Sequence, residues 1–193
     1  MRRNSKVQAL VWLKSVLVTL ILTTHSAAFS LDWRTVSSET YTLLWKDLTF
    51  TQLQVDPGQA QPENADILAP AYAKQIIIEY KVGVSADRFK KMTNKALEGA
   101  FSQVELAPAA DDIARFSNWY LAVEKGDRYR LTWLPSSGLG LYLNDKPLGV
   151  ITAPESAALI LSVWLGRAAV SEEQRDNMLA AWRATSLDAY SER

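Results

Sequence analysis

The sequence predicts an α+β fold in which helices gather on one face of a mainly antiparallel sheet. Apolar side chains alternate with a two-residue period through residues 126–151, between short turn sequences, which is typical of strands with one buried face. Segments on either side of this block space their apolar residues at helical intervals. The resulting order is strands, two helices, strands and two helices, which favours α+β over a parallel α/β sheet.

The first strands are expected in the N-terminal half of the chain. The stretch "YTLLWKDLTFTQLQV" (41–55) is rich in Thr, Leu and aromatic residues and suits one long strand or two short ones. Residues 56–73 contain three Pro and one Gly, which predicts a loop or a short irregular helix, mostly on the surface. Residues 74–84 are predicted to form a strand, and the Ile run at 76–78 indicates a central position buried on both faces.

Two helices are expected to follow. Ser85 is placed to cap a helix over 86–101, whose apolar stripe consists of Phe89, Met92, Ala96 and Ala100. Residues 107–124 open with Pro and two Asp, which suit a helix start, and then carry apolar residues at helical spacing.

The second half of the chain is expected to add strands and then two more helices. Strands alternate around Leu131 and Leu141, with "PSSG" and "NDKPLG" as turns. Helices are predicted over 153–166, ending at a Gly, and over 171–182, where Ser and Gln stand at capping-box spacing. Four residues are expected in the core, namely Leu141, Leu143, Ile160 and Trp164.

The first thirty residues read as a secretory signal peptide. A basic start, the short apolar run "SVLVTLILTT" and the small residues of "HSAAFS" form its three regions, with cleavage expected after Ala28 or Ser30. The alternative is an uncleaved anchor, but Lys14 leaves an apolar run of about half the ~20 residues that a spanning helix needs. We therefore expect a signal peptide at 1–30, a single domain at 31–193, a periplasmic or secreted location, and no stable membrane span after cleavage.

Composition excludes several classes of chemistry. The chain has no Cys, and its one His, His25, lies in the signal segment. The domain therefore lacks the residues of Ser–His–Asp and Cys–His machinery, of the usual zinc sites and of His- or Cys-ligated haem, so we expect no metal and no cofactor. Without the four basic residues of the first thirty, 21 − 4 = 17 basic residues face 21 acidic ones, a net charge of −4. An acidic domain is poorly suited to nucleic acid.

No strong catalytic motif appears. Glu79 lies inside an apolar strand, where it is expected to pair with Arg128 or Arg130. The basic residues of "DRFKK" (87–91) suit an anion site, but a solvated helix face is the simpler interpretation. The closely spaced glycines of 138–149 lack the dinucleotide-binding pattern, and we interpret them as turn residues of a β-hairpin.

One block of the sequence nevertheless resembles a known family. "EKGDRYRLTWLPSSGLGLYLNDKPLGVI" (124–151) is followed by "LSVWLG" (161–166) and "AAVSEEQRDNML" (168–179). This series is similar to the bacterial branch of the chalcone isomerase-like proteins, and the resemblance extends over roughly 36–182. It implies an open-faced sandwich, a large antiparallel sheet with helices packed on one side.

The resemblance also implies where a site would lie. The plant isomerases of this fold use an early-strand Arg, a Thr on the next strand, a Tyr and an Asn on the first major helix, and a Ser or Thr on the penultimate helix. In this sequence Thr49 matches the Thr, whereas the other positions fall near Ser37, on Phe89, near Ala96 and on Val163. Most groups that would stabilise a phenolate are thus replaced.

The leading interpretation is an exported, non-catalytic chalcone isomerase-like protein that binds a small apolar ligand between sheet and helices. Cleft candidates are Thr49, Phe89, Met92, Ala96 and Val163, with Thr49 the one catalytic candidate. A first alternative is an isomerase or intramolecular lyase with a remodelled site, which a pocket with Thr49 beside an Arg would favour. A second alternative is a structural or interaction protein with a filled cleft. The ligand and the oligomeric state stay open.

Overall fold

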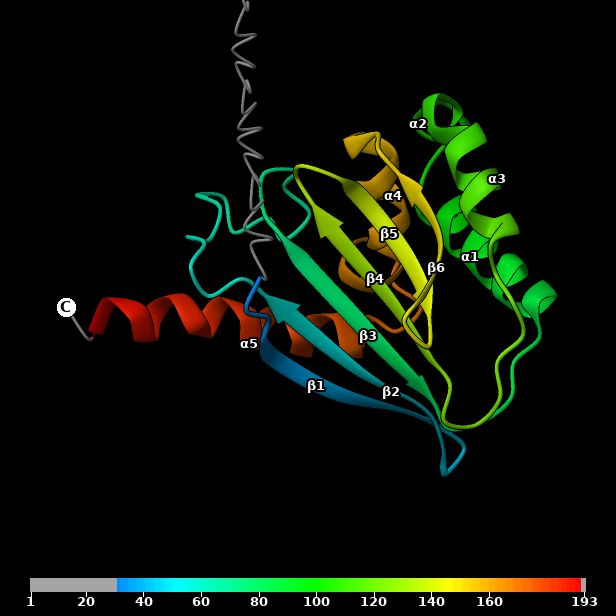
Figure 1. Cartoon of the computed structure of the whole chain (residues 1–193), viewed down its shortest axis with the longest axis horizontal. Coiled ribbons are helices and arrows are strands. Elements are labelled where there is room, and N and C mark those ends of the chain that lie inside the picture. The colour runs from blue at the N-terminus through cyan, green and yellow to red at the C-terminus, as the bar shows by residue number, and fades with distance from the viewer. Residues whose placement is uncertain (1–30, 192–193) are drawn as a thin grey trace, which may run out of the picture. The chain divides into compact units, whose positions relative to one another are not determined.

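Six strands form one sheet in sequence order, each antiparallel to its neighbours (Figure 1). The computed structural model describes residues 31–191, so the predicted signal peptide and its cleavage site lie outside the described residues. The strands are β1 (Arg34–Leu43), β2 (Lys46–Val55), β3 (Lys74–Tyr80), β4 (Arg128–Leu134), β5 (Gly138–Leu143) and β6 (Lys146–Ile151). This is the open antiparallel sheet that the alternation pattern predicted.

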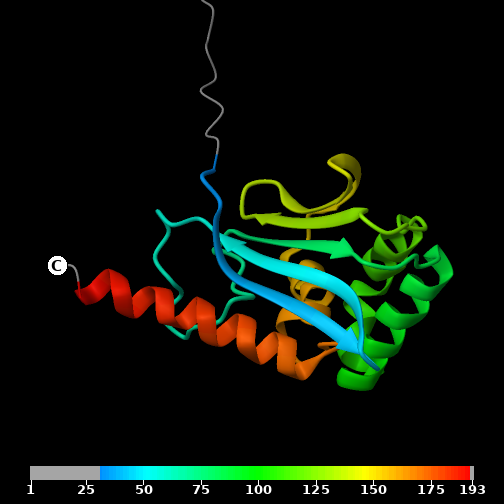
Figure 2. The same cartoon turned by 90° about the horizontal axis from the view of Figure 1, so that it is seen from below.

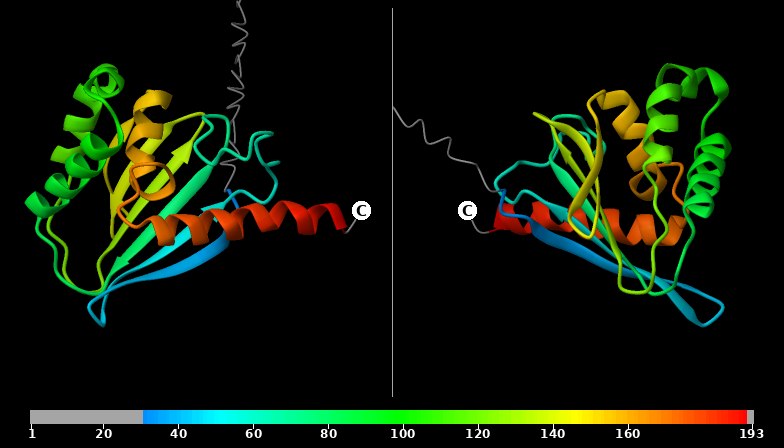
Figure 3. Two further views of the ribbon diagram at one scale, coloured as in Figure 1. Left: turned by 180° about the vertical axis from the view of Figure 1, so that it is seen from behind. Right: turned by 45° about the vertical axis from the view of Figure 1, so that its right-hand side comes forward.

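Helices cover one face of the sheet, which confirms the α+β prediction. They are α1 (Ala86–Ala100), α2 (Gln103–Leu106), the 3₁₀ turn η1 (Ala107–Ala109), α3 (Ala110–Asn118), α4 (Pro154–Leu165) and α5 (Glu172–Ser191). Figure 2 shows α4 and α5 beneath the sheet, and both views of Figure 3 show α5 running along β1. No helix within residues 31–191 is both long and apolar enough to cross a bilayer.

The N-terminal strands begin earlier than the sequence predicted. Residues 41–55 contain the end of one strand, a two-residue turn and a second strand, and β1 already starts at Arg34. The turn residues Leu44 and Trp45 have φ values of 47° and 60°, as in a type I′ turn. Neither is a residue that marks such turns in a sequence, so the hairpin has no local signal.

The helical region between β3 and β4 also differs from its prediction. Ser85 caps α1 as expected, since its side chain accepts a hydrogen bond from the backbone N–H of Arg88. The predicted helix over 107–124 is wrong at its C-terminal end, because α3 stops at Asn118. The chain after it is extended, and Val123 pairs with Val84 through two backbone hydrogen bonds of 2.9 and 3.0 Å.

The core lies between the sheet and the helices. Leu141 and Ile160 are fully buried, as predicted. Leu143 and Trp164 are only half-buried, which corrects the prediction for both. Leu143 is the last residue of β5, beside the exposed turn, and Trp164 borders a cavity.

The sheet face opposite the helices is polar. The Ile run in β3 follows this division, because Ile76 and Ile78 are buried in the core whereas Ile77 is half-buried on the outer face. The loop of residues 56–73 also contributes to the core through Ile67 and Tyr72, so it is less superficial than predicted.

Glu79 lies on that outer face, and the pairing predicted for it is wrong. Its carboxylate pairs with Lys81, two residues along the chain, at 2.6 Å. Arg128 is its neighbour across the strands but makes no ion pair with it in the described structure, and Arg130 pairs with Asp145 at 3.2 Å.

Candidate functional site

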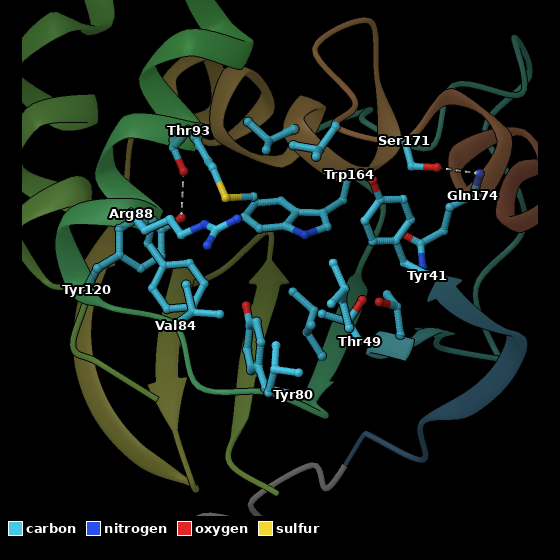
Figure 4. A pocket seen from close by; sticks show the side chains of 18 of the residues that line it. Tyr41, Thr49, Tyr80, Val84, Arg88, Thr93, Tyr120, Trp164, Ser171 and Gln174 are labelled. Atoms are coloured by element: carbon cyan, nitrogen blue, oxygen red, sulfur yellow. Dashed lines mark hydrogen bonds between the residues drawn. The ribbon is translucent and has the colours of Figure 1, made fainter. Parts of the chain in front are cut away.

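A cavity of about 350 Å³ lies between the sheet and the helices (Figure 4). Its floor is formed by β1, β2 and β3, and its other walls by α1, α4 and the start of α5. The lining residues are Tyr41, Lys46, Leu48, Thr49, Thr51, Ile78, Tyr80, Val82, Gly83, Val84, Arg88, Phe89, Met92, Thr93, Tyr120, Val163, Trp164, Val170, Ser171 and Gln174. The volume is within the range of ~300–1,000 Å³ that is common for small-ligand pockets.

The structure brings together four of the five residues proposed from the sequence. Thr49, Phe89, Met92 and Val163 line this cavity. Ala96 does not line it and packs instead against a separate apolar cluster that includes Leu97. It lies one turn beyond the helical residues that reach the cavity, so its side chain meets α4 and the following loop rather than the open space.

One wall of the cavity is a tightly packed aromatic cluster. Phe89 stacks on Tyr120 with ring centroids 5.3 Å apart, and it meets Tyr80 and Tyr129 edge to face at 5.2 and 5.4 Å. The Tyr120 hydroxyl and the Thr93 hydroxyl share a buried hydrogen bond of 3.0 Å. This network makes the wall rigid, since every ring is held by at least two others.

Burial keeps the tyrosines of this cluster neutral. Desolvation raises the pKa of Tyr80 well above its usual value, and it also raises the pKa of Tyr120, against the opposing effect of the Thr93 hydrogen bond. Both phenols are therefore protonated at neutral pH. The Tyr80 hydroxyl points toward the middle of the cavity in Figure 4, where it can donate a hydrogen bond to a ligand.

The charged residues that line the cavity are both cations. Arg88 from α1 and Lys46 from β2 border the cavity, and no carboxylate is among the residues that line it. Neither cation has an ion-pair partner within the described part of the chain. Arg88 is exposed, in line with the solvated helix face expected for the "DRFKK" segment, and its side chain also extends into the pocket in Figure 4.

Arg34, an early-strand Arg, lies far from this cavity. It pairs with Val55 at the far end of the β1–β2 hairpin, whereas Thr49 pairs with Tyr41. Thr49 and Val55 are six residues apart on one strand, so at ~3.4 Å per residue the two positions are about 20 Å apart. The cations that line the cavity together with Thr49 are therefore Lys46 and Arg88, and not Arg34.

Gln174 presents a buried polar atom at the cavity. Its backbone N–H is capped by the Ser171 hydroxyl at 3.3 Å, which fixes the first turn of α5. Its side-chain Nε2, however, is buried with no hydrogen-bond partner among residues 31–191. Buried donors in native proteins nearly always find an acceptor, so an acceptor atom on a ligand would complete this site.

The arrangement supports binding more readily than acid–base catalysis. The lining offers apolar and aromatic walls, hydroxyl donors, one amide donor and two cations, but no carboxylate, and its residues include no His. No group of three or more acidic or His residues that would hold a metal ion occurs within the described chain. Sequence analysis did not place Tyr41, Lys46, Trp164 or Gln174 at a site, because only strand register and helix docking bring them to one cavity.

Comparisons with known proteins agree with the fold and with the resemblance of the sequence. A family model described as chalcone isomerase-like matches residues 57–180. No curated protein matches the sequence. Among solved structures, the chain is similar to a fatty-acid binding protein of Arabidopsis thaliana, with a TM-score of 0.60 and 13% identity, over 81% of this chain and 91% of that one. At that identity the likeness shows a shared fold.

Proposed function

The chain belongs to the chalcone isomerase-like family, and from that premise we propose that it is a non-catalytic binding protein for a small apolar ligand with an anionic end. The observation that carries this proposal is the cavity itself, whose lining is largely apolar and whose charged residues are both cations. The structural neighbour that binds fatty acids gives the ligand class a precedent within the same fold.

The groups around the cavity suggest how such a ligand is held. The apolar body lies among Phe89, Met92 and Val163, where its burial removes hydrocarbon from water. The anionic end lies toward Arg88 and Lys46, which supply charge-assisted hydrogen bonds. These cations come from positions other than the Arg and Tyr that the family resemblance implied for the plant isomerases.

Replacing Arg88 with methionine tests this arrangement. We expect the variant to bind a saturated fatty acid at least about tenfold more weakly, because a charge-assisted contact is lost, and to bind the alcohol of the same chain length unchanged. Displacement of a fluorescent apolar probe measures both affinities. Lys91→Met is the matched control, since Lys91 is exposed on the same helix and does not line the cavity.

Two results would contradict the proposal. One is a wild-type protein that displaces the probe with neither ligand. The other is an Arg88→Met variant that loses the alcohol and the acid equally while melting at the wild-type temperature, because the arginine would then shape the cavity rather than bind the anion. Native mass spectrometry of protein from its own compartment identifies the natural ligand directly.

A second candidate function is that of an isomerase or intramolecular lyase, because Thr49 and Arg88 line the same cavity. We expect no chalcone cyclisation above the uncatalysed rate. One preorganised donor is worth ~3–4 kcal/mol, and the positions that resemble those of the active enzymes hold Phe89, Ala96 and Val163. Absorbance at the chalcone band measures the rate. Saturable turnover that disappears in Thr49→Ala would establish the isomerase instead.

Export belongs to the same proposal. A binding protein of this kind, with a basic start, a short apolar run and small residues before Leu31, is expected in the periplasm or outside the cell. N-terminal sequencing of the protein from that fraction should give Phe29 or Leu31 as the first residue, whereas an intact Met1 in the membrane fraction would rule out cleavage.

A further inference from the structure

The tip of the β1–β2 hairpin presents apolar side chains to solvent. Leu43, Leu44 and Trp45 are 49%, 72% and 92% exposed. The tip extends beyond the rest of the sheet in Figure 1 and in both views of Figure 3. An exposed apolar cluster such as this tryptophan with two leucines often marks an interaction site.

The backbone conformation of this turn indicates that Leu44 and Trp45 do not stabilise the fold. The β5–β6 turn has the same two-residue form, with φ values of 48° and 65° at Asn144 and Asp145, the residue types that tolerate it. The β1–β2 turn places Leu44 and Trp45 in the same left-handed conformation, which bulky residues disfavour. Neither side chain is buried to offset this strain, and exposed strain of this kind is typical of functional residues.

The surroundings of the tip match the surface of an anionic membrane. Lys46 follows Trp45 directly, is exposed, and has no ion-pair partner among the described residues. The one acidic residue of the turn region, Asp47, accepts a hydrogen bond from the Thr42 hydroxyl at 2.7 Å. Tryptophan and leucine beside an unpaired lysine form the combination that anchors proteins at lipid head groups.

We propose that Leu43, Leu44 and Trp45 insert into the head-group region of an anionic lipid bilayer, with Lys46 against the lipid phosphates. A bilayer fits this surface better than a protein partner, because the apolar area is a narrow projecting tip and a stable protein interface needs about 800 Å² on each side. This docking does not require the cavity to hold a ligand.

The test is co-sedimentation of the protein that begins at Leu31 with phosphatidylcholine vesicles, with and without phosphatidylglycerol. Residues 31–193 form a compact unit that holds the whole sheet and both apolar clusters. We expect sedimentation with the anionic vesicles, weakened by salt. The double variant Leu44→Asn/Trp45→Gly should bind at least about tenfold more weakly.

The double variant also reports its own folding. Asn and Gly suit the left-handed turn, so its thermal midpoint should rise above that of the wild type, and lost binding would then not result from unfolding. Val104→Asn is the matched control, because Val104 is 83% exposed on α2, far from the tip, and its replacement should leave vesicle binding unchanged.

Three outcomes overturn the proposal. The wild-type protein stays in solution with anionic vesicles, or the double variant sediments as well as the wild type. The third is a wild-type dimer, seen by analytical ultracentrifugation, that the double variant loses while neither form binds vesicles; a second copy of the chain would then cover the tip.

Discussion

Replacing Trp182 with alanine is expected to lower the free energy of unfolding by about 3–5 kcal/mol. Trp182 is fully buried on α5, and its ring lies 5.7 Å from that of Tyr72. Its Nε1 donates a hydrogen bond of 3.0 Å to the Tyr72 hydroxyl, and its carbonyl accepts one of 2.6 Å from Gln61. The residue therefore joins α5 to the loop of residues 56–73 as well as filling space in the core.

Chemical denaturation followed by circular dichroism measures this loss. Trp45→Ala is a matched control, since Trp45 is 92% exposed and its replacement should change stability by less than about 0.5 kcal/mol. Because Gln174 and Ser171 reach the cavity from the start of α5, Trp182→Ala should also weaken ligand binding. A loss of stability as small as that of the control would show that α5 docks without its tryptophan.

Replacing Lys74 with methionine is expected to stabilise the protein by about 2–3 kcal/mol at pH 6. Lys74 is 1% exposed in the core, where its Nζ donates a hydrogen bond of 2.8 Å to the carbonyl of Ala69 and lies 5.7 Å from the centre of the Trp133 ring. Burial lowers its pKa from 10.5 to about 7, against the opposing effect of Asp66. That difference corresponds to roughly 4–5 kcal/mol. The variant gives up ~1.5–3 kcal/mol of it with the charge-assisted hydrogen bond to the Ala69 carbonyl, which still accepts the backbone N–H of Tyr72.

The effect of Lys74 depends on pH in a definite direction. Below pH 7 the lysine is charged in both states, so the folded protein bears the full cost of a buried charge. Between pH 7 and 10.5 the unfolded chain still binds a proton that the folded protein has released, so the stability of the wild type rises with pH.

The advantage of Lys74→Met should therefore shrink as the pH increases from 6 to 10. Urea unfolding at both pH values measures it, with Lys91→Met as the exposed control. A stability difference between wild type and Lys74→Met that is the same at both pH values would show that the amine is not desolvated in the folded state.

The sequence predicted the elements whose patterns are local. The alternation around Leu131 and Leu141 and the cap at Ser85 each depend on neighbours a few residues apart, and the structure confirms them. The turn of the β1–β2 hairpin was not predicted, because Leu44 and Trp45 occupy positions where Asn, Asp or Gly is usual. The end of α3 was not predicted, because the segment after it pairs with Val84, some forty residues earlier, and no local pattern indicates that contact.

By itself the sequence determined the order of strands and helices, the family, and the absence of His and Cys from residues 31–193, which limits the chemistry whatever the fold. Only the tertiary structure decided that Lys46, Arg88 and Gln174 meet at one cavity, that Arg34 lies away from it, and that Lys74 is buried. The physical reason is the distance along the chain over which each kind of signal acts. Periodicity and capping report which face of an element is apolar, whereas the meeting of distant side chains depends on strand register and helix docking, which packing over the whole domain sets.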